Sequence, residues 1–151
     1  MKIESQAFSD GEMIPKKYTC EGENVSPPLQ FKDIPSDARS LVLLVEDPDA
    51  LSVKPWVHWI AFNINPATAG FGEDISAGDF KEGLSTGNGY EGPCPPSGTH
   101  RYHFRLYALN SKLELNSDID RRKLLQEMEG KIIATAVLTG LYEKQSVKHK
   151  I

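Results

Sequence analysis

Proline and glycine interrupt this chain so often that few long regular segments can form. The sequence contains ten prolines and twelve glycines in 151 residues. Proline fixes φ and lacks a backbone N–H, and glycine weakens the interiors of helices and strands. The runs between these breaks are short, and the longest are rich in leucine, β-branched and aromatic residues. This pattern is typical of a mainly β protein with many turns.

Four of the uninterrupted runs have the length and composition of β-strands. They are residues 40–46, 57–64, 102–109 and 131–143. The second run is apolar on both faces, as expected of a central strand. Regular alternation along this run predicts that His58 lies on the same face as Ile60 and Phe62.

One helix is predicted in the C-terminal half of the chain. Ser117 stands three residues before Asp120, which resembles a capping box, and Gly130 is suited to end the helix. Between them lies an apolar stripe of Ile119, Leu124, Leu125 and Met128. Residues 10–35 and 65–100 hold too many glycines and prolines for anything but short elements.

These elements predict a mainly β fold. We expect a β-sandwich of two antiparallel sheets packed face to face, with an α-helix in the C-terminal half and short helical turns. The length of 151 residues corresponds to one domain over residues 1–151. A chain of this size buries roughly 70% of its unfolded surface, so its stability requires neither a disulfide nor a metal.

Charge and the N-terminal residues limit the expected partners and location. The formal net charge is −4, and no long block of Lys or Arg is present, so no nucleic acid partner is expected. The first ten residues are polar and mixed, which indicates neither a signal peptide nor a membrane span. With Met1 as the native start, the expected location is cytoplasmic.

The two cysteines, Cys20 and Cys94, lie far apart in the sequence. Such a pair does not predict a disulfide framework, so no disulfide is expected. Cys94 lies between Pro93 and Pro95, where a small packing residue is favoured over a reactive thiol.

Gly87, Gly89 and Gly92 have the spacing of a dinucleotide-binding fingerprint. That motif functions only where the glycines follow a buried strand and open a helix. Here the preceding residues are polar, and Pro95 and Pro96 prevent a helix from starting. We therefore interpret the spacing as accidental.

The histidines do not have the pattern of a metal site. His100 and His103 are three residues apart, and strand geometry directs such positions to opposite faces. No cluster of cysteine or glutamate completes a site around them. His149 lies in a basic tail and is expected to be solvated.

A polar pocket is predicted instead at one end of the sheet. His100 and Tyr102 differ by two positions, so they share a face if their strand begins early enough. If the strands ending at Asp47 and starting at Trp56 are neighbours, the carboxylate and the His58 imidazole meet there. Taken singly, each residue has a simpler explanation: His58 as a core residue, Trp56 as packing, and Asp47 as a turn former before proline.

Several motifs, taken in order, resemble the phosphatidylethanolamine-binding protein family, also called the Raf kinase inhibitor protein family. The similarity is greatest to its compact bacterial and archaeal branch. The motifs are Asp47-Pro48-Asp49-Ala50, Trp56-Val57-His58-Trp59, Gly92-Pro93-Cys94-Pro95-Pro96 with Gly98, and His100-Arg101-Tyr102. Residues 8–11, 14–15 and 24–29 resemble the opening segment of that branch, and residues 134–136 and 140–142 resemble its final strand. The resemblance covers nearly the whole chain.

The resemblance implies a small anion pocket at one end of a β-sandwich. The implied ligand-binding residues are Asp47, Trp56, His58, Pro95, His100 and Tyr102, with Asp49, Pro96 and Arg101 as supports. Members of the family bind phosphate, phosphorylethanolamine-like headgroups or similar anions without a metal or cofactor. Some inhibit protein kinases or serine proteases, and bacterial members often form homodimers. Leu51 departs from the family pattern, which usually has proline there, so the rim beside Asp47 is expected to differ in shape.

The side chains of the pocket suit a phosphate-like anion. Imidazolium and a tyrosine hydroxyl are good donors to phosphate, whereas a carboxylate repels it. We therefore expect Asp47 either to bond to the His58 ring and favour its charged form, or to be protonated and donate itself. In the first case, anion binding weakens as the pH rises above the pKa of the histidine. Pro95 and Pro96 would hold one wall rigid.

The sequence therefore predicts a non-catalytic protein that binds a small anion or a phospholipid headgroup. One alternative is an inhibitor of a serine protease or kinase that acts through a surface loop in residues 65–100. A weak hydrolase is the other alternative. Hydrolysis is disfavoured because no serine stands beside His58 or His100 in a diagnostic motif.

Overall fold

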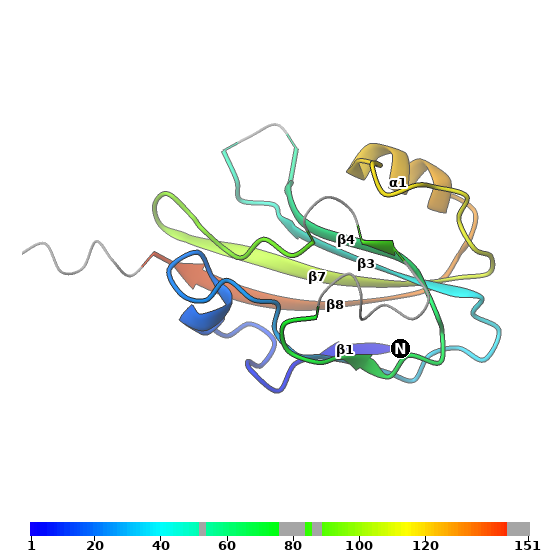
Figure 1. The fold of residues 1–151 in the computed structure, drawn as a ribbon, viewed down its shortest axis with the longest axis horizontal. Helices are drawn as coiled ribbons and strands as arrows, with labels where there is room; N and C mark the ends of the chain where they lie inside the picture. Colours follow the sequence, from blue (N-terminus) through cyan, green and yellow to red (C-terminus); the bar gives the residue numbers. More distant parts are fainter. Residues whose placement is uncertain (52–53, 76–83, 86–88, 145–151) are drawn as a thin grey trace, which may run out of the picture.

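The computed structural model describes residues 1–51, 54–75, 84–85 and 89–144. These residues form two antiparallel sheets packed face to face, as Figure 1 shows. The larger sheet has five strands in the spatial order β6-β4-β3-β7-β8, and the smaller has three in the order β1-β2-β5. The predicted β-sandwich is therefore confirmed.

The long predicted strands all belong to the larger sheet. That sheet consists of β3 (Ser40–Asp47), β4 (Trp56–Ile64), β6 (Leu84–Ser85), β7 (Thr99–Leu109) and β8 (Ile132–Glu143). The smaller sheet consists of β1 (Lys2–Glu4), β2 (Leu29–Lys32) and β5 (Gly70–Phe71). The helical elements are the 3-10 helix η1 (Lys16–Tyr18) and the α-helix α1 (Arg121–Met128). Short elements thus occupy the segments that are rich in glycine and proline, as expected.

Strand β3 lies at the centre of the larger sheet and pairs antiparallel with both β4 and β7. Every residue of β3 is buried. Leu43 and Val45 pack between the two sheets, whereas Val42 and Leu44 pack in the core under α1. Burial on both faces explains why this strand has a continuous apolar run instead of an alternating one.

Helix α1 lies over the outer face of the larger sheet (Figure 1). It begins at Arg121, and the carboxylate of Asp120 accepts a hydrogen bond from the backbone N–H of Lys123 at 2.8 Å. Asp120 is therefore the N-cap, and the predicted cap at Ser117 is wrong. The Asp120 side chain satisfies a free N–H of the first turn, so the helix starts at the next residue, Arg121. Gly130 follows the helix with φ +78°, as expected of its end.

The pairing of β3 with β4 contains a β-bulge. Val45 pairs with Trp59, but Glu46 pairs with Val57, so His58 has no partner of its own on β3. A bulge inserts one extra residue into a strand and changes the direction of the side chains around it.

The bulge places His58 and Ile60 on different sides of the sheet. The His58 ring contacts Tyr102 edge to face, with 5.2 Å between ring centroids, on the side of the smaller sheet. Ile60 and Phe62 belong to the core under α1. The predicted common face of His58, Ile60 and Phe62 is therefore wrong, because regular alternation assumes an unbroken strand. As a result, His58 lies beside a side chain of β7.

The region around the glycine fingerprint is irregular. From Gly92 to β7 the chain has no helix, and Gly87 lies outside the described residues. Residues 76–83 and 86–88, which belong to the segment predicted to present an inhibitory loop, also lie outside them, as does His149.

In the part of the chain that is described, no helix has the length and apolarity needed to cross a membrane.

Candidate functional site

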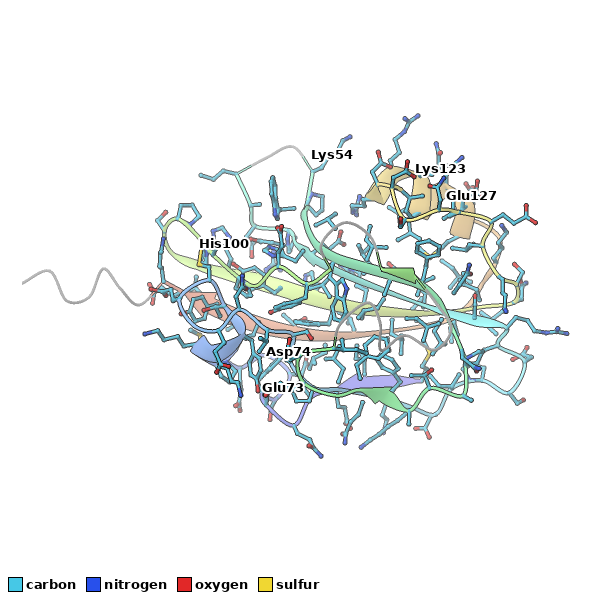
Figure 2. All side chains as sticks on the ribbon, viewed as in Figure 1. Lys54, Glu73, Asp74, His100, Lys123 and Glu127 are labelled. Carbon is cyan, nitrogen blue, oxygen red and sulfur yellow. A yellow bond between two sulfur atoms is a disulfide. The ribbon has the colours of Figure 1, made fainter. Side chains whose placement is uncertain are left out.

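A cavity of about 330 Å³ opens where β3 ends and where β4 and β7 begin. Its lining comes from these strands and from the loops before β4 and before β7: Asp47, Ala50, Leu51, Trp56, His58, Glu91, Gly92, Cys94, Pro95, Pro96, His100 and Tyr102. Figure 2 shows His100 at this end of the sandwich, away from Lys123 and Glu127 on α1. The structure therefore brings together all six residues predicted to bind the ligand, together with Pro96.

His100 forms a buried pair with Asp47. Its Nδ1 lies 2.7 Å from Oδ2 of Asp47, and the two residues are 8% and 4% exposed. The other carboxylate oxygen accepts a hydrogen bond from the backbone N–H of Asp49 at 2.7 Å. Because a carboxylate accepts, His100 Nδ1 donates, and Nε2 is the ring nitrogen left for a ligand.

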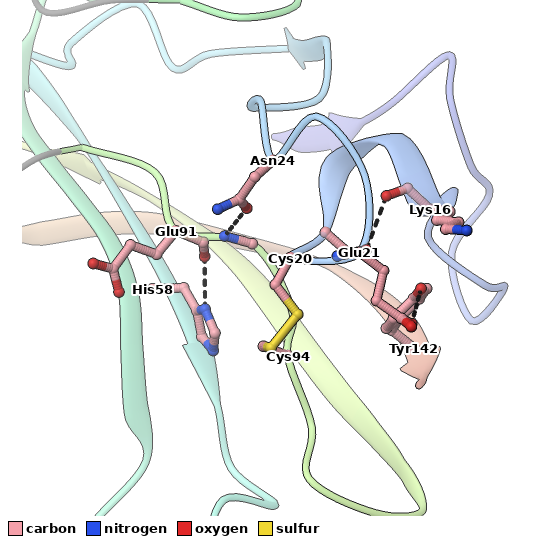
Figure 3. The surroundings of a disulfide bond; sticks show 10 residues. Lys16, Cys20, Glu21, Asn24, His58, Glu91, Cys94 and Tyr142 are labelled. Atoms are coloured by element: carbon pink, nitrogen blue, oxygen red, sulfur yellow. Dashed lines mark hydrogen bonds between the residues drawn. A yellow bond between two sulfur atoms is a disulfide. The ribbon is translucent and has the colours of Figure 1, made fainter. Parts of the chain in front are cut away.

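His58 has a different partner from the one predicted. Its Nδ1 donates to the backbone carbonyl of Glu91 at 2.6 Å, as Figure 3 shows, and the Glu91 N–H donates to the His58 carbonyl at 2.9 Å. The expected bond from Asp47 to His58 is wrong, since Asp47 binds His100 instead. The carbonyl of Glu91 is a backbone group, so no residue type in the sequence indicates this pairing.

The environment of His58 favours its neutral form. Burial lowers the pKa of His58, while the hydrogen bond to Glu91 and the carboxylates of Asp47 and Glu91 oppose this shift. In the neutral ring, Nδ1 carries the proton that is donated to the carbonyl. Nε2 of His58 therefore has a free lone pair and acts as an acceptor.

The hydroxyl of Tyr102 is buried and unsatisfied. Tyr102 is 1% exposed, and among the described residues no group forms a hydrogen bond with its Oη. Burial and the carboxylates of Asp47 and Asp49 raise the pKa of Tyr102; the backbone amide of Cys94 opposes this shift, but its contact with Oη does not have the geometry of a hydrogen bond. The ring contacts His58 edge to face and stacks with His100 at 6.4 Å between centroids. A protonated phenol thus lies between two imidazoles as an available donor.

A disulfide holds the cavity wall in place. Cys20 and Cys94 are bonded, as Figure 3 shows, and the Cys20 N–H donates to the carbonyl of Pro93 at 3.1 Å. The expectation that no disulfide forms is wrong. The segment that follows η1 packs against the cavity wall, and sequence separation carries no information about that approach. Cys94 is therefore neither a free thiol nor a simple packing residue.

A close backbone contact supports the same wall. The Gly92 N–H donates to Oδ1 of Asn24 at 2.8 Å. A Cβ on Gly92 would collide with the carbonyl oxygen of Tyr18 and with the Asn24 side chain. Only glycine allows this approach, which the sequence analysis did not anticipate.

Asp49 and Arg101 form an ion pair outside the cavity. Asp49 accepts hydrogen bonds from the Arg101 backbone N–H at 2.8 Å, from Nε at 3.0 Å and from a terminal guanidinium nitrogen at 2.9 Å. The Arg101 guanidinium lowers the pKa of Asp49 to about 2. This pair links the two sides of the Asp47–His100 contact: Arg101 follows His100 in β7, and the backbone N–H of Asp49 donates to Asp47. Its position fits the supporting role implied by the resemblance.

The mouth of the cavity is apolar and its interior lacks a permanent cation. Leu51 is 90% exposed and Trp56 is 56% exposed. Among the described lining residues none is Lys or Arg, whereas Asp47 and Glu91 carry carboxylates. Any positive charge offered by these side chains to a ligand must therefore come from an imidazole.

The remaining candidate groups lie elsewhere. Nδ1 of His103 lies 3.0 Å from Oγ1 of Thr139, and His103 does not line the cavity, so the expected separation of His100 and His103 is confirmed. Within the described ranges, no group of three or more His, Cys, Asp or Glu side chains is arranged to hold a metal ion.

One motif escaped the sequence analysis. Residues 83–87 read Gly-Leu-Ser-Thr-Gly, the spacing of a nucleophile elbow. An elbow requires a strand that turns sharply into a helix, but Ser85 pairs with Ala61 in the two-residue edge strand β6.

Fold and site together define a class of protein. A two-layer β-sandwich with a pocket of imidazole, phenol and proline groups at the strand ends is a small-ligand-binding protein. The model of the family described as phosphatidylethanolamine-binding protein matches residues 4–143. The chain belongs to this family.

Similar proteins occur in archaea and bacteria. A UPF0098 protein of Methanothermobacter thermautotrophicus is 46% identical over 151 residues, covering 95% of this chain and 99% of the relative. A UPF0098 protein of Chlamydia trachomatis is 47% identical over 150 residues, with the same coverage of 95% and 99%.

Solved structures have the same fold. A protein of Chlamydia trachomatis described as a phosphatidylethanolamine-binding protein homologue superposes with a TM-score of 0.87 at 44% identity, covering 95% of this chain and 97% of the other. Escherichia coli YbcL, described as a new member of the mammalian family, gives a TM-score of 0.86 at 27% identity, covering 95% and 98%.

Proposed function

We propose that this protein binds a small phosphate-type anion in the cavity at the end of the larger sheet. The observation that carries the proposal is the Tyr102 hydroxyl, which is buried without a hydrogen-bond partner among the described residues. Leaving such a group unsatisfied costs roughly 1–3 kcal/mol. An anionic oxygen of a ligand would accept from this hydroxyl and remove the cost.

The positive charge for the anion comes from His100. Asp47 accepts from Nδ1 of His100 and stabilises the imidazolium, and Nε2–H is then available to the ligand. The proposal accounts for a carboxylate beside an anion site in this way: Asp47 acts on the ligand through the ring of His100.

His58 selects the protonation state of the ligand. Its Nδ1 donates to Glu91, so Nε2 of the neutral ring accepts. A ligand that carries a proton on one oxygen, such as singly protonated phosphate or a monoester, matches this acceptor. The exposed Trp56 and Leu51 at the mouth offer apolar contact to a substituent, as in a phospholipid headgroup with its attached chain.

Calorimetric titration with inorganic phosphate and with phosphorylethanolamine tests the proposal. Tyr102→Phe removes the donor and is expected to weaken binding at least about tenfold, because a hydrogen bond to a charged group contributes about 1.5–3 kcal/mol. Tyr107→Phe is the matched control, since Tyr107 is also on β7 but packs towards α1. Equal affinity for wild type and Tyr102→Phe, or no phosphate binding by the folded wild type, contradicts the proposal.

A further inference from the structure

Two imidazoles enter the same cavity from different strands and in different environments. Nδ1 of His58 donates to an uncharged backbone carbonyl, whereas Nδ1 of His100 donates to the Asp47 carboxylate. Both rings lie against Tyr102, at 5.2 Å and 6.4 Å between centroids. The pocket thus presents the Nε2 of a ring bonded to a backbone carbonyl, on His58, and the Nε2 of a ring bonded to a carboxylate, on His100.

The surrounding charges maintain this difference. The charged or titratable groups that face the two rings are Asp47 from β3, Glu91 from the loop before β7, and Tyr102 from β7. Asp49 is nearby but is paired with Arg101. Burial lowers the pKa of His58, and a positive charge on His100 lowers it further. Two titratable groups whose environments separate their protonation states are suited to act as a base and an acid.

We propose that this pocket catalyses the internal transphosphorylation of small phosphodiesters that carry a hydroxyl on the carbon adjacent to the one bonded to the phosphate oxygen. His58 is the general base and His100 the general acid. This inference rests on the proposed anion-binding function, since the phosphate must occupy the same cavity. It departs from the expectation that the protein is non-catalytic.

The step balances without a further reactant. Nε2 of His58 takes the proton of the neighbouring hydroxyl while that oxygen forms a bond to phosphorus. The bond from phosphorus to the leaving oxygen breaks, and Nε2–H of His100 gives its proton to that oxygen. The products are a cyclic phosphodiester and an alcohol. His58 then loses its proton to water and His100 regains one, which restores the starting state.

The composition of the cavity selects this class of reaction. Among its described lining residues there is no Ser, Thr or Lys, and Cys94 is held in the disulfide. These side chains therefore supply no serine, threonine, lysine or free cysteine nucleophile, and the proposed reaction takes its attacking oxygen from the substrate itself. Asp47 acts as a positioning residue for His100, and the Tyr102 hydroxyl is placed to donate to a non-bridging phosphate oxygen.

The cavity also has the size of a small diester. Its volume of about 330 Å³ is about eleven times the share of one water molecule in the liquid, so it exceeds the needs of a bare phosphate. A polymer is not the expected substrate, because the lining has carboxylates and the chain has a net charge of −4.

Two probes with different leaving groups separate the two roles. β-Hydroxypropyl para-nitrophenyl phosphate releases nitrophenolate, which needs little help from an acid, and is followed by absorbance. Glycerophosphoethanolamine has an adjacent hydroxyl and an alkoxide leaving group, and its cyclic product is resolved by phosphorus NMR. All assays contain a metal chelator and use the double variant His58→Ala/His100→Ala, purified identically, as the background.

We expect wild-type rates at least about 10²-fold above the double variant, the lower end of what general acid–base groups contribute. His58→Ala is expected to reduce the rate on both probes by a similar factor. His100→Ala is expected to reduce it much more on glycerophosphoethanolamine than on the nitrophenyl ester. His103→Ala, on the other face of β7, retains wild-type rates. The wild-type rate is expected to be bell-shaped in pH, and the His58→Ala profile to lose its acidic limb.

Three results overturn the inference. They are wild-type rates no higher than the double variant, equal losses on both probes in His100→Ala, and wild-type activity that appears only when the chelator is left out. His58→Gln and His100→Gln, with unfolding transitions recorded for each, replace any alanine variant that does not fold. Calorimetry with inorganic phosphate on the same samples separates the two proposals: binding without turnover overturns only the catalytic one, and absence of both overturns both.

Discussion

Asp47 Oδ2 accepts a hydrogen bond from His100 Nδ1 at 2.7 Å, across a contact that is almost completely buried. This pairing, and not one with His58, places a carboxylate against the ring of His100. A carboxylate bonded to one ring nitrogen favours the protonated ring and fixes its orientation. The cavity is therefore asymmetric, with a ring on β7 bonded to a carboxylate and a ring on β4 bonded to a backbone carbonyl.

Asp47→Asn is expected to weaken phosphate binding at pH 7 by about tenfold or more, because the imidazolium of His100 loses its charged partner. Calorimetry with inorganic phosphate measures the change. Asp37→Asn removes the same charge from an exposed loop and serves as the control. A tighter complex with Asp47→Asn would mean that the carboxylate only repels the anion, and would contradict this role.

His58 makes the folded protein sensitive to mild acid. Burial lowers the folded pKa of His58 below its unfolded value of about 6.5, so the unfolded chain takes up a proton first as the pH falls. The stabilisation due to neutral His58 is present above pH 6.5 and is lost as the pH falls through the folded pKa. We expect the free energy of unfolding of wild type to fall between pH 7 and pH 5.

Urea denaturation at several pH values checks this prediction. In His58→Gln the dependence between pH 7 and pH 5 is expected to be shallower than in wild type. Burial also lowers the pKa of His103, but this ring is less buried, so His103→Gln is expected to change the slope less. An unchanged slope in His58→Gln would show that the ring is not neutral in the folded state.

Reducing the Cys20–Cys94 disulfide is expected to lower the free energy of unfolding by about 2–4 kcal/mol, because the bond closes a long loop in the unfolded chain. It is also expected to weaken phosphate binding, since Cys94 lies in the cavity wall. Denaturation and calorimetry with and without dithiothreitol measure both effects. The variant Cys20→Ser/Cys94→Ser should match reduced wild type and should not respond to dithiothreitol; a response would point to another target of the reductant.

Gly92→Ala is expected to be strongly destabilising, by about 2 kcal/mol or more, because the new methyl group meets the backbone of Tyr18. Gly72→Ala is the matched control, since nothing lies within 4 Å of a Cβ at that position. Thermal unfolding of the two variants gives the comparison. Similar melting temperatures for both would mean that the loop before β7 moves away from the segment after η1 at little cost.

The alternation and composition of the sequence were enough to predict the sandwich. The apolar run of residues 40–46 predicts a buried strand, and the two-residue spacing of His100 and Tyr102 predicts that they share a face of their strand. Both follow from strand geometry, which is a local property. The resemblance to the family then indicated the residues of the pocket, because its motifs lie at the ends of adjacent strands. These features depend on residue type and spacing alone.

Only the tertiary structure decided the chemistry within the pocket. The bulge that redirects His58, the Glu91 carbonyl that binds it and the approach of Cys20 to Cys94 all depend on register and loop packing. A backbone carbonyl is the same in every residue, and a contact between distant segments has no local signature. The sequence therefore determined which side chains meet, whereas the three-dimensional arrangement decided which hydrogen-bond partner each imidazole has.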